Sequence, residues 1–338
     1  NAVVDLVTTE RKDTHLRPPE ATPETTNLAS ASISASVRDT GTRQEKASEK
    51  WHTRPPFSVD HPSTTSRQYK LESIIRLQDV ASVRKSTVSD LPGVPRICFV
   101  SCVSSKGFRN MPFSKTALKT VLLKSLKSTI EPKYRYTLFI GFDKTDTYWN
   151  AHMEEIINFF HDRPFIDVEL LTVKGGSFSK AINGIAAYAH SLKKRDDLKP
   201  KGKCNYYIRI NDDSQFASHG WTTMAVEQLA KYQPQNVGVV GPTVRQGNTN
   251  ILVFDFVHRL HLDIFDTYYP AQLSNWWIDD WITQIYRPNN MKKLPLWRMN
   301  HVMKHGQRYS VNGAEKKLLS GLVKGGKKSI SEYKANHA

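Results

Sequence analysis

The chain carries, at residues 206–213, the stretch Tyr206-Tyr207-Ile208-Arg209-Ile210-Asn211-Asp212-Asp213. Its first five residues are aromatic or β-branched apart from one arginine, which predicts a buried strand. Three polar residues come directly after that strand ends. Open α/β sheets bind their ligands beyond the carboxyl ends of their strands. The stretch therefore predicts an α/β sheet with a ligand site built on these acidic side chains.

Strand-like and helix-like patterns alternate on both sides of this stretch. Strands are predicted over 96–103, 136–142, 167–173, 206–210 and 238–242, and helices over 115–129, 149–160 and 180–193. A strand-like run over 251–257 and a helical run over 281–286 come later in the chain. This alternation favours a mixed, mostly parallel sheet flanked by helices, with right-handed crossovers.

Residues 1–67 differ in composition from the rest of the chain. They are rich in Ser, Thr, Pro, Glu and Arg, contain Pro18-Pro19 and Pro55-Pro56, and have neither helical nor strand periodicity. Such a segment buries too little apolar surface to offset the entropy of ordering. We expect a disordered stem or linker over 1–67 and one folded domain over 68–338. A small folded module in the first segment is the alternative.

The formal net charge of +16 and the pI near 9.6 indicate anionic partners or a basic surface. The lysines and arginines are spread along the chain, and it contains no helix-turn-helix, zinc-finger or RNP pattern. A nucleic-acid-binding protein more often concentrates its basic residues on one element. We therefore expect no specific nucleic-acid partner. Phospholipids, nucleotide diphosphates and acidic acceptors fit the charge.

A second acidic pair lies in Trp276-Trp277-Ile278-Asp279-Asp280-Trp281. Tryptophan faces can pack on a sugar ring, and by excluding water they raise the pKa of a neighbouring carboxyl group. The alternative is core packing, with one of the two acids capping the next helix. Asn211-Asp212-Asp213 has the same kind of alternative, because Asn and Asp favour turns and caps.

These features together resemble nucleotide-sugar-dependent glycosyltransferases of the Rossmann-like GT-A fold. The resemblance covers roughly residues 95–310 and rests on the order of elements and three motifs: Lys180-Ala181-x-Asn183-Gly184-Ile185, Asn211-Asp212-Asp213 and Trp276-Trp277-x-Asp279-Asp280. The stretch 256–281 is similar to an uncharacterised eukaryotic and viral branch. In the family, an Asp-x-Asp motif binds the metal and the sugar nucleotide, and a later acidic pair binds the acceptor and supplies the base. Here Asn211 stands at the first Asp position, which leaves one charge fewer.

The resemblance implies transfer of a sugar from a nucleotide diphosphate to a hydroxyl of a glycan, a glycoprotein or another acceptor, acidic acceptors included. Mn²⁺ or Mg²⁺ would stabilise the charge that develops on the departing diphosphate. Asp213 is the first metal ligand, and Asp212 shares the ion or binds ribose or sugar hydroxyls. Asp280 is the preferred base and Asp279 the alternative. Inversion is expected because a base is present and an obvious nucleophile is not.

Histidines and one arginine complete the predicted substrate and metal sites. His258, Arg259 and His261 come after a strand-like run; a lone histidine more often has a structural role, but near two acidic motifs contact of one of these residues with acceptor or diphosphate is about equally favoured. His301 and His305 are four residues apart, so on a helix they would share one face, and one of them would complete the metal shell. A surface position is equally compatible with the sequence.

The nucleotide side is predicted from loops at the ends of strands. Val103 and Ser104 lie at the end of the first strand, where base and ribose would lie. Lys180 and Asn183 belong to a helix whose amino end attracts phosphate. Asp143 either contacts the base or only ends its strand. Neither a P-loop nor a Gly-x-Gly-x-x-Gly pattern occurs, which disfavours kinases, ATPases and dinucleotide enzymes.

Two other functional classes remain compatible with the sequence. A nucleotidyltransferase on a related fold would need a glycine-rich signature with a lysine near the first strand, and none is present. A non-catalytic protein that binds glycans or nucleic acid would explain the missing acid at Asn211. The Asp279-Asp280 pair argues against it.

The compartment is predicted only indirectly. No run of eighteen apolar residues and no signal-peptide pattern occurs, and the chain begins at Asn1. The stem favours a truncated, membrane-anchored enzyme of the Golgi or ER lumen. Cys98, Cys102 and Cys204 leave at least one cysteine unpaired and predict no disulfide framework, and no Asn-x-Ser/Thr sequon occurs, so a cytoplasmic location stays open. The oligomeric state is not predicted.

Overall fold

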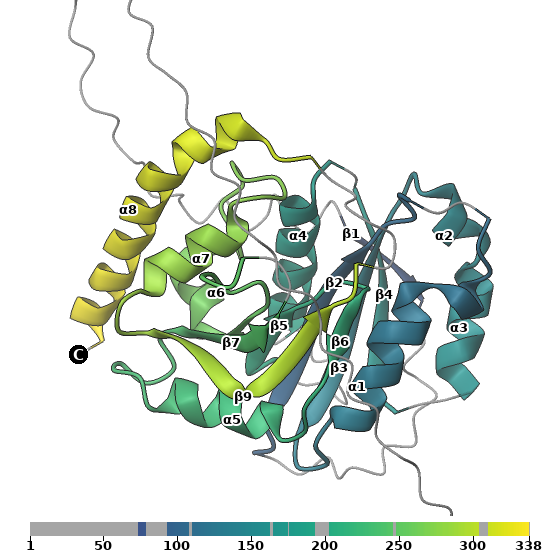
Figure 1. Cartoon of the computed structure of the whole chain (residues 1–338), viewed down its shortest axis with the longest axis horizontal. Helices are drawn as coiled ribbons and strands as arrows, with labels where there is room; N and C mark the ends of the chain where they lie inside the picture. Colours follow the sequence, from purple (N-terminus) through teal and green to yellow (C-terminus); the bar gives the residue numbers. More distant parts are fainter. Residues whose placement is uncertain are drawn as a thin grey trace, which may run out of the picture. The chain divides into compact units, whose positions relative to one another are not determined.

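A nine-stranded mixed sheet organises the protein in the computed structural model (Figure 1). The structure describes residues 74–78, 93–107, 110–162, 165–174, 176–192, 203–245, 248–303 and 310–337. The strands are β1 (Ile74–Gln78), β2 (Arg96–Val103), β3 (Arg135–Asp143), β4 (Asp167–Val173), β5 (Tyr206–Arg209), β6 (Ser214–Phe216), β7 (Val239–Val244), β8 (Asp255–His258) and β9 (Met291–His301). The predicted stem, residues 1–67, lies outside the described residues.

Helices connect these strands. They are the short 3₁₀ turn η3 (Phe113–Lys115), the π-helical turn η4 (Leu118–Leu123), α1 (Lys124–Thr129), α2 (Thr147–Ala151), α3 (Met153–Asp162), α4 (Phe178–Ser191), α5 (Trp221–Ala230), α6 (Leu260–Phe265), α7 (Ile278–Tyr286) and α8 (Gly313–Asn336). Among the helices that the structure describes, none combines the length and the apolar composition that a bilayer crossing requires.

The strand order is β1-β4-β3-β2-β5-β8-β7-β9-β6. Strands β4, β3, β2 and β5 are parallel neighbours, β8 is antiparallel to both β5 and β7, and β7 and β9 are parallel. Edge strands β1 and β6 are antiparallel to β4 and β9. Six of the nine strands therefore run in one direction, which confirms the predicted mixed, mostly parallel α/β sheet.

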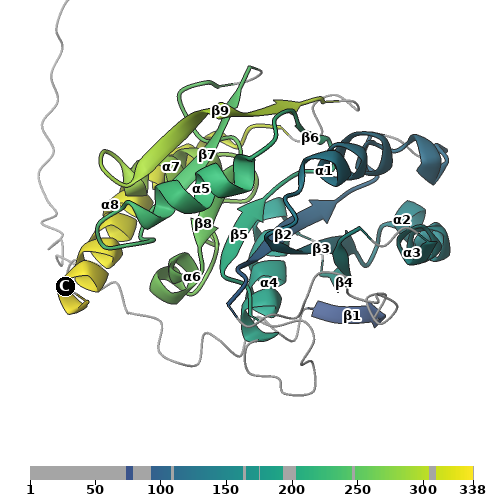
Figure 2. The same cartoon turned by 90° about the horizontal axis from the view of Figure 1, so that it is seen from below.

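Both faces of the sheet are buried, as the near-continuous apolar strands predict. On β2, Ile97 and Phe99 pack in the core under η4, α1, α3 and α5, while Cys98 and Val100 pack in the core under α4 and α7. Figure 2 shows the sheet turned by 90°, with α4 and α6 on one side of it. Helices on both faces leave the carboxyl ends of the central strands as the place for a ligand site.

Strand β9 and helix α8, which help to position the site, were not predicted. Strand β9 contains Pro295 and a basic cluster, and its buried residues Leu294, Trp297 and Met299 do not alternate regularly. Helix α8 had a recognisable start signal, because Asn312 caps it by accepting a hydrogen bond from the Ala314 N–H (3.1 Å) and Glu315 stands three residues later.

The end of β9 also corrects a prediction about histidines. His301 is the last residue of this strand, so the expected helix shared by His301 and His305 is wrong for His301. His305 lies outside the described residues.

A disulfide links β2 to the segment that leads into β5. Cys98 of β2 pairs with Cys204, two residues before β5, with their Cα atoms 5.8 Å apart. Both cysteines are buried, and Cys102 lies outside the bond. The pair was not predicted from the sequence, because the two cysteines are 106 residues apart and only the adjacency of β2 and β5 brings them together.

We expect the disulfide to stabilise the fold measurably. A cross-link over a long segment restricts the unfolded chain and typically contributes about 2–4 kcal/mol. The double variant Cys98→Ser/Cys204→Ser should therefore melt roughly 5–10 °C below the parent in calorimetry. Cys102→Ser is the control and should melt with the parent. Equal melting of all three proteins would contradict the stabilising role.

Candidate active site

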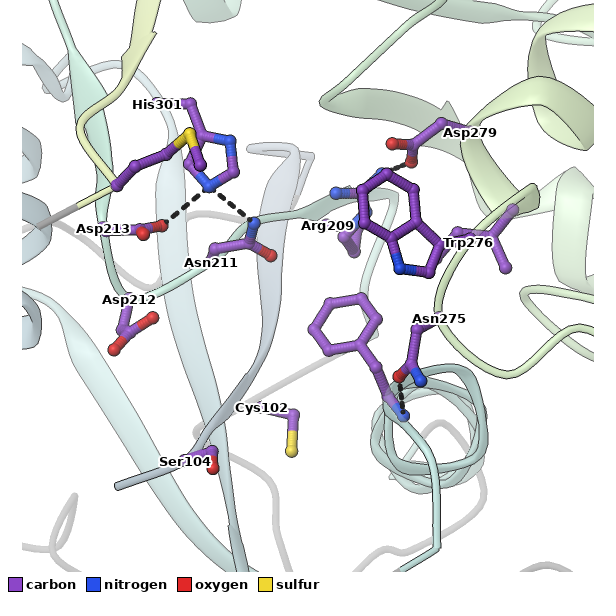
Figure 3. A pocket seen from close by; sticks show the side chains of 13 residues that line it. Cys102, Ser104, Arg209, Asn211, Asp212, Asp213, Asn275, Trp276, Asp279 and His301 are labelled. Atoms are coloured by element: carbon purple, nitrogen blue, oxygen red, sulfur yellow. Dashed lines mark hydrogen bonds and ion pairs between the residues drawn. The ribbon is translucent and has the colours of Figure 1, made fainter. Parts of the chain in front are cut away.

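A cavity of about 200 Å³ opens at the carboxyl ends of β2 and β5 (Figure 3). Its walls come from the end of β2, the start of α4, the end of β5 with Asn211-Asp212-Asp213, residues 275–279, and the end of β9. Both acidic motifs that the sequence singled out contribute to it. The carboxylates of Asp212, Asp213 and Asp279 belong to one site, although α7 is far from β5 in sequence.

One wall is formed where β5 gives way to β6. The Asn211 N–H donates to Ser214 Oγ (2.8 Å), and the Ser214 N–H donates to the Asn211 carbonyl (3.2 Å), so a tight turn presents the acidic residues. Strand β6 then pairs with β9, with Ser214 opposite His301. This pairing places His301 Nε2 3.1 Å from Asp213 Oδ1.

The described side chains on this wall offer a partial set of metal donors. Asp212 and Asp213 are each 2% exposed. The side chain of Asn211 lies 3.4 Å from His301 Nε2, and its Oδ1 is buried without a hydrogen-bond partner among the described residues. No group of three or more His, Cys, Asp or Glu side chains in the described part of the chain comes together as a metal site. A cation here would need further ligands from a bound substrate.

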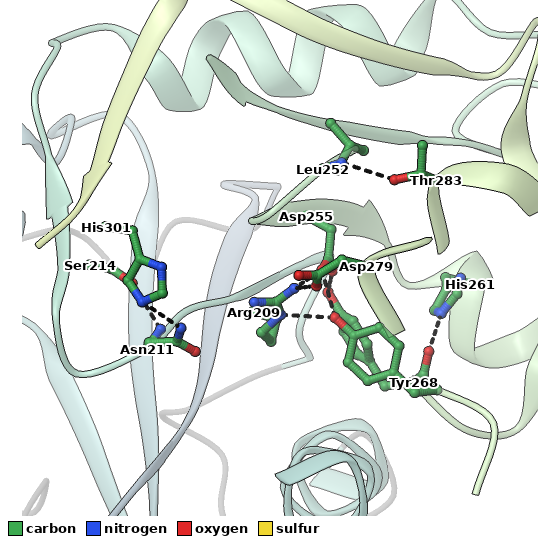
Figure 4. A network of polar contacts seen from close by, with 11 residues as sticks. Arg209, Asn211, Ser214, Leu252, Asp255, His261, Tyr268, Asp279, Thr283 and His301 are labelled. Carbon is green, nitrogen blue, oxygen red and sulfur yellow. Dashed lines mark hydrogen bonds and ion pairs between the residues drawn. The ribbon is translucent and has the colours of Figure 1, made fainter. Parts of the chain in front are cut away.

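The opposite wall is built on a buried arginine (Figure 4). Arg209 lies directly across from Asp255 in the β5–β8 ladder, and its Nη2 is 3.1 Å from Asp255 Oδ2. The same nitrogen donates a short hydrogen bond to Asp279 of α7. Burial disfavours the charged guanidinium, but Asp279, Tyr269 and Asp255 outweigh it and raise the pKa of Arg209 well above its usual value. Arg209 is therefore a permanent cation between two carboxylates.

Two tyrosines complete this network. The Tyr268 and Tyr269 hydroxyls each donate to Asp255 at 2.6 Å, and Arg209 Nε donates to Tyr269 Oη at 2.9 Å. Asp255 is fully buried and has both carboxylate oxygens engaged. A carboxylate that is so completely hydrogen-bonded serves to hold Arg209 in place.

Asp279 differs from Asp255 because it opens on the cavity. Its side chain is 27% exposed, and it lines the cavity. Burial raises the pKa of Asp279 to about 6, with Arg209 acting in the opposite direction and Asp255 adding to the rise. Asp279 is therefore ionised at neutral pH and basic enough to accept a proton.

Asp280, the base preferred from the sequence, is absent from the described lining of the cavity. Because successive residues of a helix point about 100° apart, Asp279 and Asp280 of α7 face in different directions. Burial raises the pKa of Asp280, while its own backbone N–H and Lys316 at the start of α8 lower it. The structure thus separates the two acids: Asp279 lies on the cavity and Asp280 lies within electrostatic reach of α8.

The three tryptophans around α7 have three different environments. Trp276 is 37% exposed and lines the cavity. Trp277 instead donates its indole N–H to the Asn312 carbonyl (2.9 Å). Trp281 is buried and donates to the Leu322 carbonyl of α8 (3.2 Å). Of the three, only Trp276 is among the described residues that line the cavity, whereas Trp277 and Trp281, which were also expected to offer their faces to a sugar, make their hydrogen bonds to Asn312 and to α8.

The loop that carries Trp276 is held by two helices. Asn275 Oδ1 accepts from the Phe178 N–H (3.0 Å) and the Ser274 carbonyl from the Ser179 N–H (2.8 Å), both at the start of α4. Glu315 near the start of α8 accepts from the Ser274 N–H (2.9 Å). These bonds fix the wall through the protein's own contacts.

The residues predicted for the nucleotide side lie in different environments. Ser104 lines the cavity together with Cys102. Val103 is buried in the core, and Lys180 lies on the exposed side of α4. Neither belongs to the described lining of the cavity. Asp143 accepts from the Thr145 N–H (2.9 Å) and so ends its strand, which was the alternative role for that residue.

Asn183 has a structural role. Its Nδ2 donates to the Tyr269 carbonyl (2.8 Å), and its Oδ1 accepts from the Tyr269 N–H (2.8 Å). It therefore braces the tyrosine that contacts Arg209 and is not among the described residues lining the cavity.

His258, Arg259 and His261 were predicted to contact substrate, and the structure contradicts this. Because β8 runs antiparallel to β5, His258 lies opposite Tyr206, at the end of β5 remote from Asn211. Arg259 contacts the Cys204 carbonyl (3.4 Å). His261 is buried between Tyr286 and the Tyr268 carbonyl, each at 2.9 Å. Burial lowers the pKa of both histidines to about 4, so they are neutral structural residues.

Several site residues were missed by sequence reasoning, above all Arg209, Asp255, Phe178 and Asn275. Arg209 did carry a signal. A charged residue in an otherwise apolar strand is almost never buried without a partner. That signal predicts a buried carboxylate nearby, but it does not say which one.

Comparisons with known proteins find a distant structural likeness. No protein-family model matches the sequence, and no curated protein matches it. Among solved structures, S. aureus TarS is similar over 68% of this chain and 39% of that chain, with 12% sequence identity and a TM-score of 0.43. The match thus spans well under half of TarS.

We expect Asp255→Asn to loosen the arginine network and to lower the pKa of Asp279. Asp255 contributes to the raised pKa of Asp279, so removing its charge leaves Arg209 to stabilise the Asp279 carboxylate more effectively. Breaking a buried ion pair should also destabilise the fold by about 3 kcal/mol. Carbon-detected NMR titration of the Asp279 carboxyl and calorimetry measure both effects. Asp143→Asn is the control, and an Asp279 pKa that stays or rises in Asp255→Asn would contradict the assignment.

Proposed function

We propose that the protein is a metal-dependent glycosyltransferase that transfers a sugar, with inversion, from a nucleotide-diphosphate donor to a hydroxyl acceptor. The observation that carries the proposal is the single cavity shared by two acidic motifs. In the first motif, Asp213 lies beside the imidazole of His301. In the second motif, Asp279 has a raised pKa and lines the cavity together with the exposed Trp276. Sugar transfer requires both functions: a site that binds the donor diphosphate and a base that deprotonates the acceptor hydroxyl.

The donor side is assigned to Asp213, His301 and Asp212, with the Asn211 amide as a further oxygen ligand. His301 Nε2 lies 3.1 Å from Asp213 Oδ1, so this wall places an imidazole nitrogen and a carboxylate oxygen side by side, and both atoms are of the kinds that would hold a divalent cation. The buried Asn211 Oδ1, without a described hydrogen-bond partner, fits the same interpretation. Magnesium-type sites often use one or two carboxylates and complete the shell with substrate phosphates. When bound, the ion would stabilise negative charge on the departing diphosphate.

The acceptor side is assigned to Asp279 and Trp276. Asp279 takes the proton from the attacking hydroxyl, and Arg209 fixes the direction in which its carboxylate points. Trp276 offers its ring to the apolar face of a sugar. Asp279 replaces Asp280 as the preferred base, because Asp279 is the one that borders the cavity.

The compartment proposed for this reaction is oxidising. Disulfides persist in secretory compartments and are rare where glutathione keeps thiols reduced. The buried Cys98–Cys204 bond therefore supports the expected Golgi or ER lumen over the cytoplasm. The acceptor is a glycan, a glycoprotein or another hydroxyl compound.

The metal assignment is tested with Asp213→Ala. Titration calorimetry with UDP-, GDP- and CMP-sugars should show Mn²⁺-dependent binding of at least one donor to the parent. The same donor should lose that dependence in Asp213→Ala, because the first protein ligand is gone. Glu227→Ala, which changes an exposed acid of α5, is the control and should bind as the parent does. Equal Mn²⁺-dependent binding by Asp213→Ala would refute the metal assignment, and binding of no donor by the parent would refute the donor class.

The base is tested with the matched pair Asp279→Asn and Asp280→Asn. A general base must be deprotonated, so kcat/KM of the parent should rise with pH through about 6, the pKa of Asp279. Asp279→Asn should keep donor binding, lose turnover by roughly 10²–10⁴-fold and lose this acid limb. Asp280→Asn should retain both turnover and the limb. The reverse pattern would assign the base to Asp280.

A further inference from the structure

A second groove, with a volume of about 330 Å³, shares no lining residue with the candidate active site. It lies between the continuous helical segment η4–α1 on one side and α3 with the loop before β4 on the other. We call it the lysine groove and define it by Lys119, Thr120, Lys124, Lys127, Phe159 and Phe165. None of the described residues that line it is acidic.

The charge of the lysine groove arises from the sequence of its helical wall. Residues 113–130 contain no Asp or Glu, whereas lysines recur at 119, 124 and 127. Leu118, Leu122 and Leu126 bury the opposite side of the segment in the core, which leaves the lysine side facing the groove. Like charges three residues apart on a helix, as at 124 and 127, destabilise it slightly. Among the described residues, no carboxylate forms an ion pair with Lys119, Lys124 or Lys127.

One of the three ammonium groups is held in place by aromatic rings. Lys119 Nζ lies 5.1 Å from the Phe113 ring centroid and 5.0 Å from that of Phe159. The two rings meet edge to face, with centroids 5.7 Å apart. Cation–π contacts of this kind contribute about 0.5–1 kcal/mol at exposed sites. The Lys119 charge is therefore positioned before any ligand arrives.

The backbone of the groove is unusual as well. Leu118–Leu123 forms a π-helical turn, and Lys119 and Thr120 belong to it. Turns of this type are rare and occur frequently at functional sites. Here the turn coincides with the part of the wall that carries a fixed cation and a hydroxyl.

We propose that the lysine groove binds an acidic saccharide. Carboxylate-bearing sugars match its three components: the ammonium groups pair with the anions, the Phe159 and Phe165 rings pack on the C–H faces of the pyranoses, and Thr120 Oγ1, which donates to the Thr116 carbonyl (2.8 Å), accepts a hydrogen bond from a sugar hydroxyl. A simple polyanion would use only the lysines, and a neutral glycan only the rings. The groove would hold such a saccharide whether or not the cavity at Asp213 transfers sugar. Saccharide binding in the lysine groove and sugar transfer in the cavity are therefore tested independently.

Titration calorimetry of the full chain with tetragalacturonic acid, at an ionic strength of about 0.15 M, tests the proposal. The parent should bind saturably. Lys124→Glu/Lys127→Glu should bind about tenfold more weakly, because two partly exposed ion pairs become repulsive. Lys317→Glu/Lys327→Glu on the exposed side of α8 makes the same change in net charge and should stay within about twofold of the parent. Lys124→Ala/Lys127→Ala provides a second, milder variant and should weaken binding in the same direction.

Two further ligands separate saccharide recognition from charge alone. The methyl ester of tetragalacturonic acid keeps the rings and removes the charge, and tetraglutamate keeps carboxylates without sugar rings. Both should bind much more weakly than the acid. Three results would overturn the proposal: no saturable binding of the acid, equal losses in the groove and α8 double variants, or tetraglutamate binding as tightly as the saccharide, which would instead indicate an acidic peptide site.

Discussion

The interaction on which this site depends is the buried contact of Arg209 with two carboxylates. Asp255 faces it across the β5–β8 ladder, and Asp279 reaches it from α7. Removing one partner from a buried ion pair leaves an uncompensated charge and destabilises a fold by several kcal/mol. The network therefore ties the start of α7 to the sheet and fixes where the second acidic motif can lie.

The same network explains how two carboxylates on one arginine differ in chemistry. Asp255 has no exposed surface and receives hydrogen bonds from two tyrosines as well as the guanidinium. Asp279 shares the guanidinium and opens on the cavity, and its pKa is raised to about 6. One cation between two anions leaves a net negative charge, which keeps the exposed partner more basic than it would be in a simple ion pair. The buried acid thus supplies position, and the exposed acid is left available for proton transfer.

The other wall is positioned by strand pairing. The turn after β5 leads into β6, a strand of three residues whose only described partner in the sheet is β9. That pairing sets His301 beside Asp213, and the bonds from α4 and α8 to residues 273–275 set Trp276 across the cavity. Segments from five parts of the chain therefore meet at one opening, each held by backbone hydrogen bonds. Such preorganisation is what a site that stabilises developing charge requires.

The sequence by itself determined the α/β class and most of the strands, and it singled out Asn211-Asp212-Asp213 and the acidic pair after Trp276, which contribute to one cavity. These features are local: apolar runs end in acids, and a strand delivers the residues after it to the edge of the sheet. Only the tertiary structure decided that Asp279 and not Asp280 borders the cavity, that His258 and His261 are structural, and that Cys98 reaches Cys204. Those outcomes depend on the direction of β8, on the rotation of α7 and on the adjacency of β2 and β5. Each of these features is set by packing between residues far apart in the chain, so it cannot be predicted from the periodicity of a single segment.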